Sequence, residues 1–246
     1  MKHPSSARPS PHKVAKASVM IATPIYRQPN ARFTVALAET VHALASRGLG
    51  GQFICQQGNL IGNARNALAG AFLASDATHL MWIDDDMFWS SVDVLCLLEK
   101  DLPFAAGVYR TRRVGHHNAA TEAWLWQPAT ERDAIVEHPS MKLFEASYVA
   151  GGFVMLKREV FKALMMAHPD WKGASRNGNH EWQFYAAAND LGEDVKFCRD
   201  WRATGGKIYV DPTIWLGHVG DFVFGGRVLE SLGAAKRSTI TRDGVA

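Results

Sequence analysis

Short apolar runs alternate with helix-spaced apolar positions through the first half of this chain. Four runs have the length of single buried strands, at residues 18–24, 52–57, 79–83 and 104–109. Between them, apolar residues recur every three or four positions, which predicts helices with one buried face near residues 33–47, 62–75 and 91–100. Strands that alternate with helices favour a parallel sheet covered by helices on both faces. The pattern therefore predicts an α/β fold.

The second half has a less regular pattern. Residues 110–145 mix charges, histidines and tryptophans without clear periodicity. We expect a strand pair at residues 145–149 and 153–156, joined by the turn Ala150-Gly151-Gly152. Further elements are expected as helices near residues 158–167, 180–191 and 193–203, the last closed by Gly205-Gly206, and a strand at residues 207–210.

Composition places these elements in one globular domain. The chain has 246 residues, of which 47% are hydrophobic and 21% charged, as in ordinary globular proteins. Its net charge of +3 is too small to indicate a class of binding partner. We expect a disordered basic leader at residues 1–17, a single domain at 18–222 and a basic tail at 223–246. The chain has no apolar run of the roughly 20 residues that span a bilayer. Three isolated cysteines, Cys55, Cys96 and Cys198, favour a reducing cytoplasm over a disulfide framework or zinc site.

Three consecutive acids, Asp84-Asp85-Asp86, end the third predicted strand. Adjacent carboxylates repel one another, so this strand end needs a counter-charge, and Mg²⁺ or Mn²⁺ prefers such oxygen ligands. Side chains on alternate positions of an extended segment share a direction, so Asp84 and Asp86 converge while Asp85 diverges. Ligands bind at the carboxyl ends of strands in such sheets, although a solvated acidic turn that caps the next helix is the alternative.

Several motifs follow in an order that resembles the GT-A fold nucleotide-sugar glycosyltransferases, in particular their large inverting family of bacterial and viral enzymes. The resemblance covers residues 18–220 and implies a Rossmann-like three-layer sandwich with a mostly parallel central sheet, in which the acidic triplet is the DxD motif. The motifs are Thr23-Pro24, Ala64-Arg65-Asn66, Asp84-Asp85-Asp86, Gly151-Gly152-Phe153, Gly192-Glu193-Asp194 and Leu216-Gly217-His218-Val219-Gly220.

The resemblance implies a metal bound beneath a sugar diphosphate. Asp86, His218 and Asp84 would be metal ligands, and Asp84 would also face the nucleoside and ribose of the donor. A histidine nitrogen beside carboxylates favours Mn²⁺ over Mg²⁺. Asp194 would be the catalytic base, because an inverting transfer needs one carboxylate to take the proton of the acceptor hydroxyl. Stabilisation of a helix dipole is the structural alternative for Glu193 and Asp194.

The resemblance also divides the remaining residues between donor and acceptor. Arg65 would pair with a phosphate or the base, and Tyr26 would stack on the base, with packing roles as alternatives. Basic residues interleaved with aromatics at 110–126 suit a phosphate-bearing or sugar acceptor, or else form a solvated loop. Donor-side residues are Thr23, Pro24, Tyr26, Arg65, Asn66, Asp84 and Asp85; sugar- or acceptor-side residues are Gly151, Gly152, Glu193, Arg110 and Trp124.

The sequence thus favours a metal-dependent inverting glycosyltransferase that uses a nucleotide-diphosphate sugar, with UDP-sugars preferred, and a glycan acceptor. A phage-type DNA glycosyltransferase acting on a hydroxymethylated base and a non-catalytic nucleic-acid or carbohydrate binding module are the alternatives. Residues 23–26 read Thr-Pro-Ile-Tyr instead of a glycine-rich basic loop, which argues against a nucleotidyltransferase. The acids follow the third strand and not the first, which argues against a phosphatase.

Overall fold

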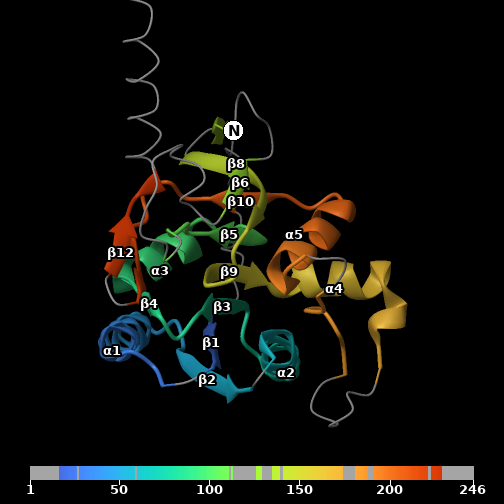
Figure 1. The fold of residues 1–246 in the computed structure, drawn as a ribbon, viewed down its shortest axis with the longest axis horizontal. Coiled ribbons are helices and arrows are strands. Elements are labelled where there is room, and N and C mark those ends of the chain that lie inside the picture. The colour runs from blue at the N-terminus through green and yellow to red at the C-terminus, as the bar shows by residue number, and fades with distance from the viewer. Residues whose placement is uncertain are drawn as a thin grey trace, which may run out of the picture.

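The protein folds into a central sheet with helices on both faces (Figure 1). The computed structural model describes residues 17–26, 28–58, 60–110, 112, 126–128, 135–138, 141–173, 181–187, 191–220 and 223–228. Most of the expected leader and of the expected tail lie outside these ranges. The predicted α/β three-layer sandwich with a mostly parallel central sheet is confirmed.

The central sheet joins two groups of strands. β9 and β8 run opposite to all the other strands, as the pairings show. The order across the sheet is β2 (Gln52–Gln57), β1 (Val19–Ile25), β3 (His79–Ile83), β9 (Phe153–Lys157), β5 (Phe104–Ala106), β10 (Ile208–Val210), β8 (Met141–Val149) and β6 (Trp126–Pro128), with β7 (Ile135–His138) also paired to β8.

One face of the sheet is covered by α1 (Ala31–Ser46) and α3 (Ser91–Glu99). Their apolar side chains, such as Phe33 and Leu97, pack with Ile21 of β1. The other face is covered by α2 (Ile61–Ala74), α4 (Arg158–Ala167) with the short 3₁₀ helix Pro169–Trp171 after it, and α5 (Glu193–Ala203). Because successive side chains of a strand point to opposite faces of the sheet, each strand contributes residues to the core on both faces.

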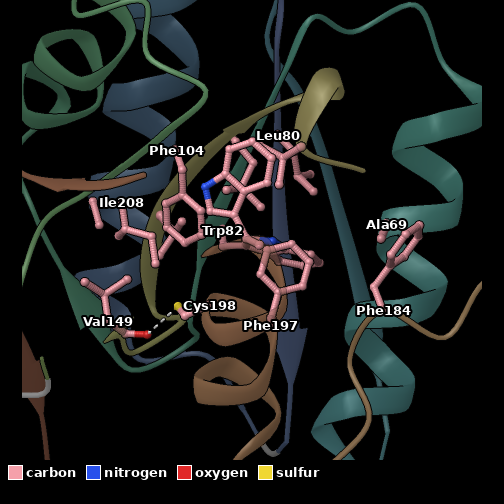
Figure 2. Close-up of a cluster of buried hydrophobic side chains, with 14 of the residues drawn as sticks. Ala69, Leu80, Trp82, Phe104, Val149, Phe184, Phe197, Cys198 and Ile208 are labelled. Carbon is pink, nitrogen blue, oxygen red and sulfur yellow. Dashed lines mark hydrogen bonds between the residues drawn. The ribbon is translucent and has the colours of Figure 1, made fainter. Parts of the chain in front are cut away.

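Figure 2 shows the core on the α2–α4–α5 face, in which Phe197 of α5 lies near Trp82 of β3. Cys198 donates a hydrogen bond to the carbonyl of Val149 at 3.6 Å, which joins α5 to the end of β8. Burial raises the pKa of the Cys198 thiol to about 12. The thiol therefore stays protonated and serves packing, not nucleophilic chemistry.

A second, three-stranded sheet lies beside the first and carries the end of the described chain. It consists of β4 (Met87–Phe88), β11 (Leu216–Val219) and β12 (Val223–Gly226), in the order β12-β11-β4. His218 is paired with Met87 in this sheet. The folded chain thus extends past residue 222, where we expected the tail to begin.

Two predicted elements are wrong. The strands at residues 141–149 and 153–157 do not pair with each other, because β9 inserts antiparallel between β3 and β5 while β8 pairs with β10. The helix expected at 180–191 is absent from residues 181–187. There, Asn66 clamps the backbone of Tyr185 through bonds of 2.8 and 3.1 Å to its amide and carbonyl. The predicted helices at 158–167 and 193–203 are confirmed.

Candidate functional site

The carboxyl ends of β1 and β3 open into a cavity of about 510 Å³. β1 and β3 are parallel, so residues that follow them meet at one edge of the sheet. The start of α5 and strand β11 close the same space. The lining residues are Pro24, Ile25, Tyr26, Gly58, Ile61, Ala64, Asp84, Asp85, Asp86, Tyr109, Arg112, Ala150, Asp194 and His218. Many of the residues singled out from the sequence thus lie around one cavity.

Asp86 and His218, which are far apart in the sequence, come together at this cavity. The Oδ2 atom of Asp86 lies 3.3 Å from the Nε2 atom of His218. Pairing of β11 with β4 brings them together, and the backbone amide of Val219 also donates to the carbonyl of Asp86 at 2.7 Å. Both side chains are largely buried, with 26% and 11% of their surfaces exposed.

The histidine is oriented as a metal ligand would be. Its Nδ1 atom lies 2.8 Å from the carbonyl oxygen of Arg110, and since a carbonyl only accepts, Nδ1 carries the hydrogen. In the neutral ring, Nε2 then presents a lone pair toward the Asp86 carboxylate, an arrangement that favours a cation between them. Mg²⁺ or Mn²⁺ about 2.1 Å from two ligands at right angles holds those ligands about 3 Å apart, so this pair fits such an ion.

Asp84 is drawn away from the other two expected ligands. Its Oδ1 atom accepts a hydrogen bond from Nη2 of Arg65 at 2.8 Å. Burial raises the pKa of Asp84 to about 6, although the Arg65 charge opposes this shift. Among the described residues, no three His, Cys, Asp or Glu side chains cluster closely enough to hold a metal on their own. The described residues therefore offer Asp86 and His218 as a pair of adjacent candidate ligands.

Arg65 lies beneath the cavity and not in its lining, so direct pairing with a phosphate does not fit. It is 1% exposed, and its guanidinium donates to Asp84 and, at 3.2 Å, to the carbonyl of Gly151. Burial alone would lower its pKa, but Asp84 and the other acids around it raise the pKa above its ordinary value. Arg65 shares its helix face with Leu68, Ala69 and Phe72, a spacing that already indicated burial.

Asn66 and Thr23 are also buried and do not line the cavity. The Asn66 side chain is occupied by the backbone of Tyr185, so a direct donor-binding role does not fit its position. Pro24 and Tyr26 do line the cavity, and Tyr26 is 66% exposed. Asp85 lines the cavity together with Asp84 and Asp86, and its Oδ2 atom accepts from the backbone amide of Tyr26 at 3.2 Å.

Of the two acids at the start of α5, Asp194 faces the cavity. Its Oδ2 accepts from the backbone amide of Gly151 at 3.2 Å, and its Oδ1 accepts from that of Val195 at 2.8 Å. Glu193 turns the other way, and its Oε1 lies 3.5 Å from Nε of Arg65. Two backbone amides thus hold the Asp194 carboxylate at the cavity wall, whereas Glu193 does not line the cavity.

The two glycines after β8 are required by the protein's own side chains. A Cβ atom on Gly151 would lie 2.8 Å from Nη2 of Arg65, and one on Gly152 would lie 2.4 Å from the hydroxyl of Tyr109. That hydroxyl accepts a hydrogen bond from the amide of Gly152 at 3.0 Å. Close packing of buried polar groups therefore explains both glycines, whether or not a sugar also approaches them.

Sequence reasoning did not single out Tyr109 as a site residue, and it placed Arg112 only within the basic segment expected to bind the acceptor. The Tyr109 ring packs edge-on against the His218 ring, with centroids 5.1 Å apart. Arg112 Nη1 lies 3.1 Å from Oδ2 of Asp86, and its membership of the basic segment after β5 was the available signal. Arg110 is exposed and contributes its carbonyl to His218. Trp124 lies outside the described residues.

A second cavity of about 680 Å³ adjoins the first. The two share Tyr26, Asp85, Asp86 and Arg112, so the acidic segment and Arg112 form the wall between them. The second cavity extends to the start of α1, where the Asn30 side chain accepts from the amide of Arg32 at 2.9 Å. Arg112 therefore borders both spaces.

No family model and no curated protein matches this chain. Similar solved structures include A197 from STIV (14% identity, TM-score 0.49, 82% of this chain and 86% of that one). They also include GalNAc-T7 with UDP, GalNAc and Mn²⁺ (14%, 0.47, 82% and 43%) and UDP-glucose pyrophosphorylase complexed with UDP-glucose (10%, 0.45, 92% and 100%). This chain spans less than half of the GalNAc-T7 chain. All three TM-scores lie below 0.5, so the functional argument rests on the geometry of the site.

Within the described ranges, the structure contains no helix with the length and apolar character needed to cross a membrane.

Proposed function

We propose that this protein transfers a sugar from a nucleotide-diphosphate sugar, with UDP-sugars preferred, to an acceptor hydroxyl of a glycan, with inversion at the transferred carbon. The observation that supports this most directly is the convergence of Asp86, His218 and Asp194 around one cavity at the carboxyl ends of β1 and β3. A cation-binding pair and a separate carboxylate are the two groups that such a transfer requires.

The donor half of the site is proposed to follow the cavity wall. Pro24, Tyr26 and Ile61 offer apolar and aromatic surface for a nucleobase. Asp86 and His218 would hold Mn²⁺, or Mg²⁺, against the diphosphate. When bound, the ion supplies Lewis-acid stabilisation of the departing nucleoside diphosphate. Arg65 would act indirectly, because it holds Asp84 and the Gly151 carbonyl in place.

The chemical step is assigned to Asp194. One of its carboxylate oxygens takes the proton of the acceptor hydroxyl as that oxygen bonds to the anomeric carbon, while the bond from this carbon to the diphosphate oxygen breaks. Attack from the face opposite the leaving group inverts the configuration. The amides of Gly151 and Val195 keep the carboxylate in position during the transfer.

The function is tested with the purified full chain, Mn²⁺, a panel of nucleotide sugars, and reactions with and without oligosaccharide acceptors. We expect release of nucleoside diphosphate with one donor. Asp194→Asn should lower kcat by about a hundredfold or more while donor affinity stays near that of the wild type, because a base is lost and not a binding group. Glu193→Gln is the matched comparison and should lower kcat much less.

The opposite result would contradict the proposal. If no donor yields nucleoside diphosphate with any acceptor, the transferase function fails. If Asp194→Asn and Glu193→Gln retain equal kcat values, Asp194 is not the base.

A cytoplasmic location is also proposed, because Cys55, Cys96 and Cys198 are all free thiols.

A further inference from the structure

Arg112 occupies a position that the proposed reaction has not yet used. Its Nη1 atom lies 3.1 Å from Oδ2 of Asp86, the same oxygen that faces His218 at 3.3 Å. Nη1 also donates to the carbonyl of Val219 at 3.3 Å. One carboxylate oxygen therefore faces both the guanidinium and the imidazole, on the edge where a metal ion would bind.

This arrangement solves an electrostatic problem for the metal-free protein. His218 donates from Nδ1 to the Arg110 carbonyl, whereas Arg112 is the permanently charged group next to the Asp86 carboxylate. A partly buried carboxylate without a counter-charge is costly. The Arg112 guanidinium supplies that charge, and it does so at the oxygen that a metal would need.

Arg112 and a divalent ion therefore compete for Asp86. An ion between Asp86 and His218 would lie within a few ångströms of the guanidinium, and like charges at that range repel strongly. Arg112 is able to leave, because its side chain is 49% exposed. In the conformer paired with Asp86, Arg112 packs against Gly220, where a Cβ atom would lie 3.1 Å from Cδ of Arg112.

The displaced guanidinium has a destination. Arg112 lines both cavities, including the one proposed to hold the donor diphosphate. A planar guanidinium binds phosphate oxygens through two parallel hydrogen bonds, a geometry that lysine does not reproduce. Rotation of an exposed side chain takes picoseconds to nanoseconds, so such an exchange would be fast.

We propose that Arg112 is a positioning residue that pairs with Asp86 until metal and donor bind together, and then moves to the diphosphate. This inference rests on the proposed donor site. Its consequence is that Arg112 opposes binding of the bare metal but favours binding of the metal with a diphosphate. The site then binds the two together better than it binds the metal alone.

The test measures two affinities with probes that need no knowledge of the sugar. Mn²⁺ binding to the full chain is followed by electron paramagnetic resonance, and binding of inorganic pyrophosphate at saturating Mn²⁺ is followed by calorimetry. For Arg112→Ala we expect Mn²⁺ alone to bind about three- to tenfold more tightly and pyrophosphate about tenfold more weakly. A purely structural role would not shift the two affinities in opposite directions.

Two further variants sharpen the result. Arg112→Lys keeps the positive charge but loses the planar guanidinium that can form two parallel hydrogen bonds. Mn²⁺ affinity should therefore stay near that of the wild type while pyrophosphate affinity falls. Arg47→Ala removes an exposed arginine at the end of α1, away from both cavities, and should leave both affinities unchanged. Circular dichroism confirms that each variant is folded.

Each outcome has a clear meaning. If folded Arg112→Ala binds Mn²⁺ and pyrophosphate as the wild type does, or loses pyrophosphate affinity alone, the exchange is overturned. Donor turnover by the wild-type protein in that case leaves the proposed function standing. If the wild-type protein binds no Mn²⁺ with or without pyrophosphate, the metal site beneath both proposals is overturned.

Discussion

At the scale of single residues, Gly151 joins the two halves of the candidate site. Its amide donates to Asp194, the proposed base, and its carbonyl accepts from Arg65, which in turn holds Asp84. The glycine lies tightly against the buried Arg65 guanidinium, which cannot move aside because Asp84 pairs with it and Trp82 lies 5.1 Å from it. This residue has no space for a side chain.

Gly151→Ala should therefore destabilise the fold. The added Cβ atom would lie 2.8 Å from Arg65, and such overpacking lowers the free energy of unfolding by about 1–3 kcal/mol. Urea unfolding measures the change. Gly173→Ala is the control, because a Cβ atom there has no neighbour within 4 Å, and its effect should stay within about 0.5 kcal/mol. Equal effects of the two substitutions would contradict this account.

Residue roles were only partly predictable from the sequence. Motif order indicated Asp86, His218 and Asp194, and all three lie at the cavity. The same motifs placed Arg65 and Asn66 on the donor, yet both are buried as supports. Their partners, Gly151 and Tyr185, are distant in the sequence, so a local pattern could not reveal them.

At the scale of elements, Arg158 links two helices on one face of the sheet. It is the first residue of α4. Its guanidinium donates hydrogen bonds to carbonyls at the end of α2, namely those of Phe72 at 2.8 Å, Leu73 at 3.1 Å and Ser75. Its Nε donates to the carbonyl of Ala77 at 2.8 Å. Carbonyls in the last turn of a helix lack partners within the helix, and Arg158 supplies a charged donor to those of α2.

Arg158→Met should thus destabilise the contact between α2 and α4. The change keeps much of the apolar stem but leaves the carbonyls at the end of α2 without a charged donor, at a cost of about 2–3 kcal/mol in the free energy of unfolding. Lys162→Met, on an exposed position of α4, should change it little. Chemical denaturation measures the free energy of unfolding of both variants. An equal decrease in the two variants would refute the capping role of Arg158.

The elements themselves were predicted with uneven success, for a physical reason. The periodicity at 158–167 and 193–203 is local and gave both helices with their observed bounds. The direction of β9 was missed because an apolar run such as 153–156 fits a buried strand of either direction. Its partners, β3 and β5, are chosen by tertiary packing.

At the scale of the whole molecule, the site lies where the central sheet, α5 and the small sheet meet. A ligand that binds only the folded chain at this junction would stabilise the fold. The three-layer arrangement followed from the alternation of strands and helices, whereas the small β12-β11-β4 sheet did not, because its strands are short and separated in sequence.

Mn²⁺ and UDP together should raise the melting temperature. At a hundredfold excess over Kd, binding adds about 2.7 kcal/mol, or about 5–10 °C for a chain of this size. A chelator should remove the gain, and Asp86→Asn should abolish its Mn²⁺-dependent part. Asp76→Asn, an exposed acid before the opposite end of β3, is the matched control and should keep it. A shift that survives the chelator would argue against a metal-dependent donor site.

The pairing of His218 with Met87 in the small sheet has a consequence for how the protein is made. Asp86 is synthesised early and His218 late, and the ladder that holds them together needs both. A nascent chain thus builds its first strands and helices, and can fold them, long before it possesses a complete cation-binding pair. Under the proposed function, capture of the ion would mark a chain whose synthesis has passed residue 218 and whose last strands have docked.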